Sequence, residues 1–242
     1  METHHRAALV RAISPDRLRA FRLESARSGR DELRLYLWDR DLSAAAIADI
    51  AILEVALRNA MNDALTRSSG RPDWYRQAMG LDNRSLQAVA RAWNDVPESR
   101  RTPGRVVAQL MFGFWRNLLE AGGDVGFGPL KRSVDYEDLW RASLHSAFRG
   151  GRAVALAEHG QFTRAWTLDT VKEVQAIRNR AAHHEPLLNG IPIPGANRRI
   201  TIQEGLARCF KLARLLDRDL ETWLRSNSSL AAALAMEPGD DL

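Results

Sequence analysis

Apolar residues recur at intervals of three and four along most of this chain, which is the period of an α-helix with one buried face. Alternation with a period of two, which indicates a half-buried strand, is not sustained in any convincing run. The pattern therefore predicts an all-α protein, with helices over residues 14–26, 31–38, 43–67, 72–79, 82–96, 105–120, 135–148, 153–158, 169–185 and 200–225.

Capping residues support several of these boundaries. Ser14 followed by Pro15 is a good N-cap and first-turn pair. Ser43 and Asp169 are expected to cap the helices that follow them. Pro186 ends the helix that contains residues 171–185, because proline disfavours the α conformation at the preceding residue and has no N–H to donate.

These helices are predicted to form one domain over residues 14–225. A short segment, 1–13, precedes the domain, and a polar tail, 226–242, is expected to be flexible. Residues 186–199, with three prolines and two glycines, are predicted to form a long loop beside the end of the preceding helix. A loop of that length can contact or gate a substrate, or it can simply connect two helices.

Composition is that of a globular protein, with 45% apolar and 27% charged residues in 242. The net charge of +5 fits a polyanionic partner such as RNA without requiring one. The single cysteine, Cys209, excludes an intrachain disulfide framework. The most apolar stretch, residues 44–57, is interrupted by Asp49 and Glu54 and is too polar to span a bilayer. No signal peptide is evident, so the expected location is the cytoplasm, without membrane association.

Candidate chemistry is concentrated at the end of the helix over residues 171–185. Val171, Val174, Ile177 and Ala181 fall on one apolar stripe, whereas Asn179 and His183 line the opposite side. Arg178 lies about 40° from the centre of the apolar stripe, where an unpaired guanidinium is costly to desolvate. It therefore needs a partner or a ligand. His183 and His184 lie in the last turn, and a histidine can donate or accept a proton near neutral pH.

A second polar group lies within the helix predicted over residues 43–67. Glu54 and Arg58 fall inside its apolar stripe, four residues apart with the acid first, so they can pair along the helix. Burial makes both charges expensive unless further partners exist. Asn59 follows Arg58 directly.

The arrangement of Arg178, Asn179 and, after three further residues, His183 resembles the signature of HEPN domains. With His184 and Glu185 it resembles more specifically the Abi-like (abortive infection) branch of that superfamily. Residues 53–59, with Trp74 after them, and residues 112–115 resemble earlier segments of Abi-like proteins, so the resemblance covers roughly residues 14–225. It implies an all-helical, HEPN-like bundle with additional helices, in a homodimer whose two motifs face each other. It also implies metal-independent RNA cleavage, a role as a toxin or in phage defence, and by family habit an antitoxin partner.

Cleavage of RNA through its own 2′-hydroxyl requires a base, positive charge at the phosphorus and an acid for the leaving oxygen. In this hypothesis His183 transfers protons, Arg178 binds the scissile phosphate and Asn179 orients the ring of His183. No cofactor is expected.

The remaining motif residues have supporting roles in the same hypothesis. His184 and Glu185 lie at the rim or at the dimer contact. Glu54, Arg58 and Asn59 support the site, with Glu54 a candidate partner for Arg178.

Three other interpretations compete with this one. A metal site made of His183, His184 and Glu185 is disfavoured, because adjacent histidines on a helix point about 100° apart. A helical dimer could instead bind RNA or a protein without catalysis. Finally, the polar residues could serve only as capping and surface groups, since this spacing often arises by chance.

Overall fold

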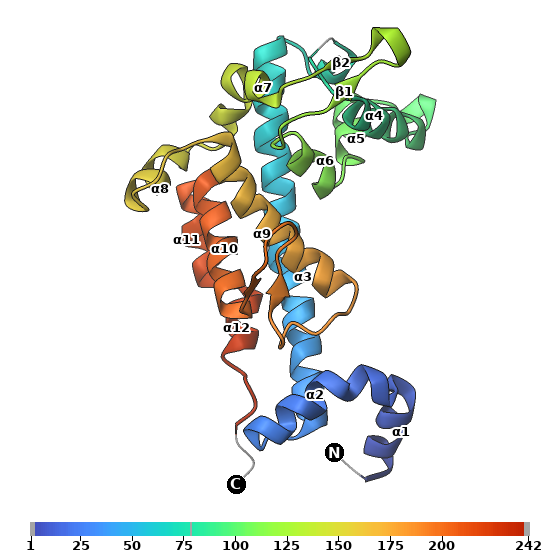
Figure 1. Ribbon diagram of the computed structural model, residues 1–242, viewed down its shortest axis with the longest axis vertical. Helices are drawn as coiled ribbons and strands as arrows, with labels where there is room; N and C mark the ends of the chain where they lie inside the picture. Colours follow the sequence, from blue (N-terminus) through green and yellow to red (C-terminus); the bar gives the residue numbers. More distant parts are fainter. Residues whose placement is uncertain (1–2, 78, 240–242) are drawn as a thin grey trace. The chain divides into compact units, whose positions relative to one another are not determined.

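The computed structural model describes residues 3–77 and 79–239 (Figure 1). Helices contain 70% of the residues and strands 3%, which confirms the all-α prediction. Residues 1–2 of the predicted N-terminal segment, residue 78 of the helix predicted over 72–79, and residues 240–242 of the predicted tail lie outside the described residues.

The helices and strands follow the chain in a simple order. The α-helices are α1 (Thr3–Ile13), α2 (Pro15–Ser28), α3 (Glu32–Ser69), α4 (Asn83–Asp95), α5 (Pro103–Ala108), α6 (Phe112–Asn117), α7 (Tyr136–Ala142), α8 (Gly151–Ala157), α9 (Arg164–Ala182), α10 (Ile202–Leu216), α11 (Arg218–Asn227) and α12 (Ser229–Leu234). Two antiparallel ribbons, each of two short strands, are formed by β1 (Asp124–Val125) with β2 (Arg132–Ser133) and by β3 (Ile191–Pro192) with β4 (Arg199–Ile200). Short 3-10 helices cover Trp74–Arg76, Glu98–Arg100, Gly128–Leu130 and Leu144–Ala147.

The chain divides into two compact units that each combine distant segments. The first unit contains Met1–Ile50, Ala176–Ala207 and Arg225–Leu242, and the second contains Ala51–Gln175 and Arg208–Leu224. The candidate motif at the end of α9 belongs to the first unit, whereas Glu54, Arg58 and Asn59 belong to the second.

The first unit has a small apolar core and a buried aspartate that caps the start of a helix. Four fully buried side chains from α2 and α3 form one apolar cluster, namely Leu18, Phe21, Leu33 and Leu35. The buried carboxylate of Asp49 accepts the hydroxyl of Ser228 and the N–H groups of Ser229 and Leu230. A side chain of α3 therefore satisfies the free N–H groups that begin α12. Residues 229–234 of the predicted tail are consequently helical.

Aromatic residues form the core of the second unit. Trp74, Phe114 and Trp115 are buried, with ring centroids 5.0 to 6.3 Å apart. The indole N–H of Trp74 donates to Asn62 (2.9 Å), so its polar edge is satisfied. The segment at residues 112–115 therefore has the role of an aromatic core.

Three predicted helix boundaries are wrong for identifiable reasons. Ser43 caps nothing, because α3 runs unbroken from Glu32 to Ser69 and buries the serine on its inner face. Asp169 lies inside α9, which begins at Arg164. The helix predicted over residues 200–225 is divided at Asp217, whose carboxylate accepts the N–H groups of Asp219 and Leu220 and so caps α11.

The helix predicted over residues 105–120 is also divided. Helix α5 ends at Ala108 and α6 begins at Phe112, whose N–H donates to the carboxylate of Glu54 (3.0 Å). An acidic side chain 58 residues away in the sequence thus takes part in starting α6. Within the part of the chain that the structure describes, no helix has the length and apolarity needed to cross a membrane.

Candidate functional site

Helix α9 presents its apolar and polar residues on opposite sides, as the sequence predicted. Val171, Val174, Ile177 and Ala181 are buried, and Asn179 and His183 are exposed. Within the first unit, α10 approaches α9 closely at Gly205, where an added Cβ would lie 3.0 Å from the Cδ1 atom of Ile177. Buried apolar contacts therefore fix the helix that carries the polar motif.

The helix ends in a tight turn that contains both histidines. The N–H of His184 donates to the carbonyl of Ala181 (3.0 Å), and the N–H of Glu185 donates to that of Arg180 (2.9 Å). This crossed pair is the Schellman pattern of a helix C-terminus. Its left-handed position, usually glycine, is taken by His184 with φ of 56°. His183 and His184 are both exposed.

Two arginines on this helix end have different surroundings. Arg180 donates to the carbonyl of Pro186 (2.7 Å) and pairs with the carboxylate of Glu185 (2.8 Å), and its side chain is only 13% exposed. Burial lowers the pKa of Arg180, although the negative charges of Glu185 and Asp39 oppose this effect. Arg178 is half-buried, and no described residue of the first unit accepts a hydrogen bond from it or forms an ion pair with it. Arg180 is held by the protein, whereas the guanidinium of Arg178 is free to bind an anion.

Asp39 of α3 forms a hydrogen bond with the main chain that follows the motif. Asp39 is 5% exposed, and its carboxylate accepts the N–H of Leu188 (2.7 Å). Burial raises the pKa of Asp39 to about 6, although hydrogen bonds from the N–H groups of Leu188 and Leu187 and the charge of Arg180 lower it. The predicted loop beyond Leu188 contains the β3–β4 ribbon, in which Ile191 pairs with Ile200.

The structure brings only part of the predicted site into one unit. Arg178, Asn179, His183, His184 and Glu185 share the end of α9.

Glu54, Arg58 and Asn59 lie on α3 in the second unit. There the carboxylate of Glu54 accepts the N–H of Phe112, and Arg58 donates to the side chain of Asn59 (3.4 Å). The pairing of Glu54 with Arg178 stays a prediction.

Some polar side chains of the motif are bound within the protein, and others are exposed without a partner in the described part of their unit. Among the described residues, no group of three His, Cys, Asp or Glu side chains is arranged to hold a metal ion. Glu185 is already paired with Arg180. Asn179 and His183 are joined through the backbone, since the N–H of His183 donates to the carbonyl of Asn179 (2.9 Å). The side chains of Asn179 and His183 thus remain available to a ligand.

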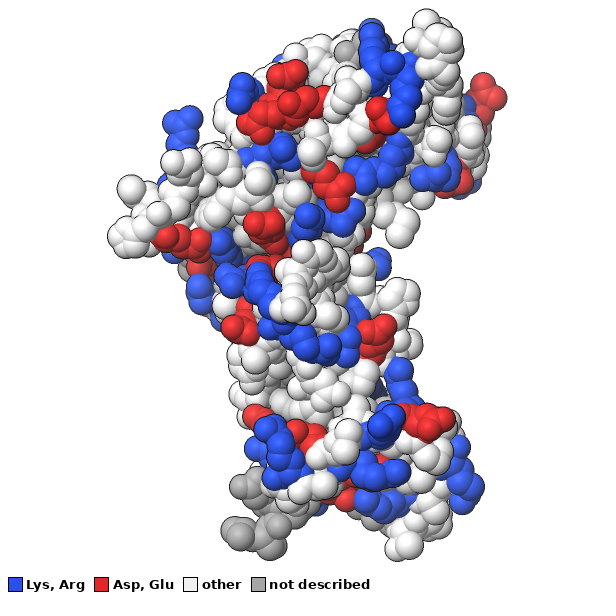
Figure 2. All heavy atoms as spheres, in the orientation of Figure 1, with Lys and Arg blue, Asp and Glu red and all other residues white. Residues whose placement is uncertain are grey.

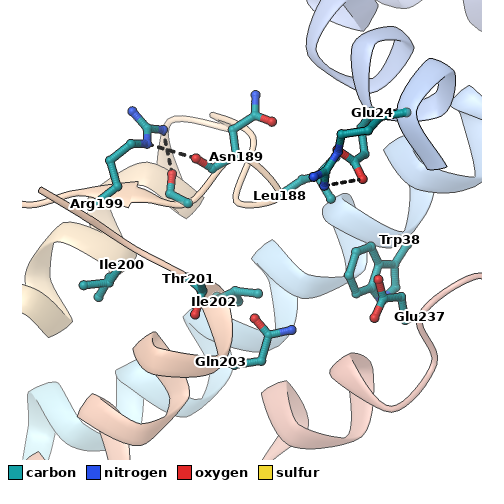
Figure 3. Close-up of a pocket in the computed structure, with 12 residues that line it drawn as sticks. Glu24, Trp38, Leu188, Asn189, Arg199, Ile200, Thr201, Ile202, Gln203 and Glu237 are labelled. Atoms are coloured by element: carbon teal, nitrogen blue, oxygen red, sulfur yellow. Dashed lines mark hydrogen bonds and ion pairs between the residues drawn. The ribbon is translucent and has the colours of Figure 1, made fainter.

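A pocket of about 440 Å³ lies elsewhere in the first unit, between the β3–β4 ribbon and helices α2 and α3 (Figure 3). Its charged side chains are engaged by the protein: Glu24 with Arg27, Glu237 with Arg30, and Arg199 with the carbonyls of Asn189 and Gly190. These contacts leave the pocket walls without an obvious free charge for a ligand, in contrast to Arg178.

On the face drawn in Figure 2, surface charge does not single out an RNA-binding surface. Figure 2 shows Lys and Arg side chains interspersed with Asp and Glu over the face drawn, rather than gathered into one basic patch. The net charge of +5 is therefore a weaker indication than the local motif.

Comparison with protein-family models, curated proteins and solved structures finds no match for this chain. The resemblance to the Abi-like HEPN group therefore stays a hypothesis that rests on the motif residues.

Sequence reasoning missed Arg180 and Asp39, whose side chains bind the main chain directly after the motif. A signal existed for Asp39, because it lies three or four residues from Leu35 and Leu42 on the buried side of α3. An acid at such a position requires hydrogen-bond partners. No comparable signal distinguishes Arg180 from Arg178, because the partners of Arg180 lie beyond the end of the helix.

Proposed function

We propose that this chain is a metal-independent endoribonuclease of the HEPN type and acts as a toxin or phage-defence effector. The observation that carries the proposal is Arg178, a half-buried residue that lacks a protein partner in its unit and lies on the same helix end as two exposed histidines. An arginine without a protein partner can direct its guanidinium N–H groups to an anion, and such charge-assisted hydrogen bonds are the strong kind.

The proposed reaction cleaves RNA by attack of its own 2′-oxygen. The 2′-hydroxyl loses its proton to a base, the 2′-oxygen bonds to phosphorus, and the bond from phosphorus to the 5′-oxygen breaks as that oxygen takes up a proton. His183 transfers protons in these steps. Arg178 neutralises the charge that develops on the phosphate through two charge-assisted hydrogen bonds. Asn179 orients His183. The products carry a 2′,3′-cyclic phosphate and a 5′-hydroxyl.

A second copy of the chain completes the site in this proposal. Positions five apart on a helix differ by about 140° in direction and about 7.5 Å in height, so Arg178 and His183 of one chain diverge. Two helices that cross in a homodimer bring the arginine of one copy toward the histidine of the other. An antitoxin protein that covers the motifs would restrain such an enzyme in the cell.

The test is cleavage of a mixed RNA pool by purified protein in excess EDTA, followed by analysis of the fragment ends. Wild type is expected to yield cyclic phosphate and 5′-hydroxyl ends. His183→Ala and Arg178→Ala should each lose at least about a hundredfold in rate, the scale of lost acid–base or electrostatic catalysis. His159→Ala, which removes another exposed histidine, is the matched control and should cleave as wild type does.

Undiminished cleavage by folded His183→Ala would remove this histidine from the mechanism. Activity that EDTA abolishes would contradict metal independence. RNA that wild type retains without cutting, and that Arg178→Ala releases, would favour the non-catalytic RNA-binding alternative.

A further inference from the structure

The two histidines of the motif lie in a short turn, and the residues before and after them are joined by side-chain contacts. The guanidinium of Arg180, which precedes the histidines, reaches the carboxylate of Glu185 and the carbonyl of Pro186, which follow them. The crossed backbone hydrogen bonds of the turn join the same two ends, since the N–H of Glu185 donates to the carbonyl of Arg180. Residues 180 and 185 are thus linked twice, through the main chain and through the side chains.

The turn between these ends is strained. His184 has a left-handed backbone with φ of 56°, a conformation that is unfavourable for a residue other than glycine. Such a conformation persists only where surrounding contacts hold it. The Arg180 contacts are suited to this, because the Arg180 side chain is only 13% exposed and binds both Glu185, whose side chain is 51% exposed, and the carbonyl of Pro186.

A further hydrogen bond holds the main chain directly after the turn. The buried carboxylate of Asp39 accepts the N–H of Leu188, and its negative charge lies near Arg180. Residues 185, 186 and 188 therefore each have a side-chain anchor, whereas His183 and His184 have none and are exposed. The main chain is therefore held on the C-terminal side of the two histidines, and both histidines are exposed to solvent.

We propose that Arg180, with Glu185 as its partner, is a positioning residue that sets the orientation of His183 and His184 for RNA cleavage. The functional part of this inference rests on the proposed ribonuclease activity, and the geometric part does not. Arg180 touches neither substrate nor reacting atoms in this role. Arg180 affects the histidines only by holding the conformation of the turn that contains them.

The experiment compares Arg180→Lys with Arg164→Lys. Arg164 lies at the opposite end of α9, is 14% exposed, pairs with Glu137 (3.1 Å) and donates to the carbonyl of Leu119 (2.6 Å). It therefore matches Arg180 in burial and in partners but is remote from the histidines in sequence. Glu185→Gln is the milder variant, because it keeps an oxygen acceptor for Arg180 and removes only the charge. It serves as the test if Arg180→Lys does not fold.

Two readouts separate positioning from general destabilisation. The first is the histidine Cε1–H spectrum without RNA, with His183 and His184 assigned by single substitutions and His145 and His159 as internal references. Arg180→Lys and Glu185→Gln are expected to move the His183 and His184 signals toward the unfolded-peptide position. The reference signals should stay unchanged, and Arg164→Lys should move neither motif signal.

The second readout is RNA cleavage at matched folded protein. Arg180→Lys should lower kcat by about tenfold with little change in KM, because orientation of the proton-transfer group is lost. Arg164→Lys should stay within about twofold of wild type. Motif signals that remain in place in both Arg180→Lys and Glu185→Gln would overturn the inference. If wild type cuts no RNA, the proposed function fails, and the spectra alone still decide whether Arg180 positions the histidines.

Discussion

Asp39 gives the most direct quantitative prediction, because its carboxyl group is buried and its pKa is moved far from the ordinary value. Burial raises that pKa from 3.8 to about 6. At 1.36 kcal/mol for each pH unit, this difference corresponds to about 3 kcal/mol of differential interaction between the two protonation states. Asp39→Asn removes the ionisation while keeping an oxygen that can accept the N–H of Leu188.

The direction in which stability changes with pH follows from proton binding by Asp39 in the folded and unfolded states. Because the folded-state pKa lies above the unfolded one, the folded protein holds this proton more tightly between pH 3.8 and about 6. The contribution of Asp39 to stability is therefore fully present below pH 3.8 and is lost as the pH rises through about 6. The free energy of unfolding of wild type, minus that of Asp39→Asn, should fall by up to about 3 kcal/mol from about pH 3.5 to 7.5.

Urea unfolding followed by circular dichroism, at intervals across this pH range, measures the difference. Asp31→Asn is a control of opposite sign. Burial raises the pKa of Asp31, but the hydrogen bonds from the Arg34 N–H and from Arg6 together lower it by more, so the net shift is downward. The stability contributed by Asp31 is present above pH 3.8 and is lost as the pH falls below it. A wild-type minus Asp39→Asn difference that is flat or rises with pH would refute the reasoning about Asp39.

Two further predictions concern backbone groups of the first unit. His184→Gly should raise the free energy of unfolding by at most about 1 kcal/mol, because glycine adopts φ of 56° without strain, whereas the neighbouring His183→Gly should lower it. Thermal unfolding of the two variants checks this, and stabilisation by both or by neither would contradict it. Asp49→Ala should destabilise by about 2 to 3 kcal/mol, because it leaves the N–H groups of Ser229 and Leu230 without an acceptor. Asp49→Asn should lose less, and an unchanged denaturation midpoint for Asp49→Ala would show that the cap contributes little.

Local signals in the sequence were sufficient for some elements. Ser14 and Pro15 begin α2, with the Ser14 hydroxyl accepting the N–H of Arg17, and Gly29 ends it in the left-handed conformation. Asp82 likewise caps α4 through the N–H of Ser85. In these cases the capping group and its partner lie within three or four residues of each other, so a short stretch of sequence contains the whole interaction.

Boundaries that depend on distant residues could not be predicted in this way. Helix α6 begins where Glu54 reaches the N–H of Phe112, and α12 begins where Asp49 reaches Ser229. Neither contact has a local signature. Ser43 illustrates the opposite error, because a good capping residue became part of a continuous helix whose apolar side extends through Leu42 and Ala46. Tertiary burial outweighed the local preference.

The candidate site shows the same division between local pattern and distant partners. The motif spacing selected Arg178 and His183 as candidate site residues. It could not show which arginine at the helix end is bound by other groups of the protein. Arg180 is neutralised by Glu185 and approached by Asp39, so a structural role accounts fully for its position. That role does not account for Arg178, a half-buried residue that has no anionic partner in its own unit. Its guanidinium is available to an anionic ligand at the helix end. In the proposed function this anion is the phosphate of RNA, on which the adjacent histidines act.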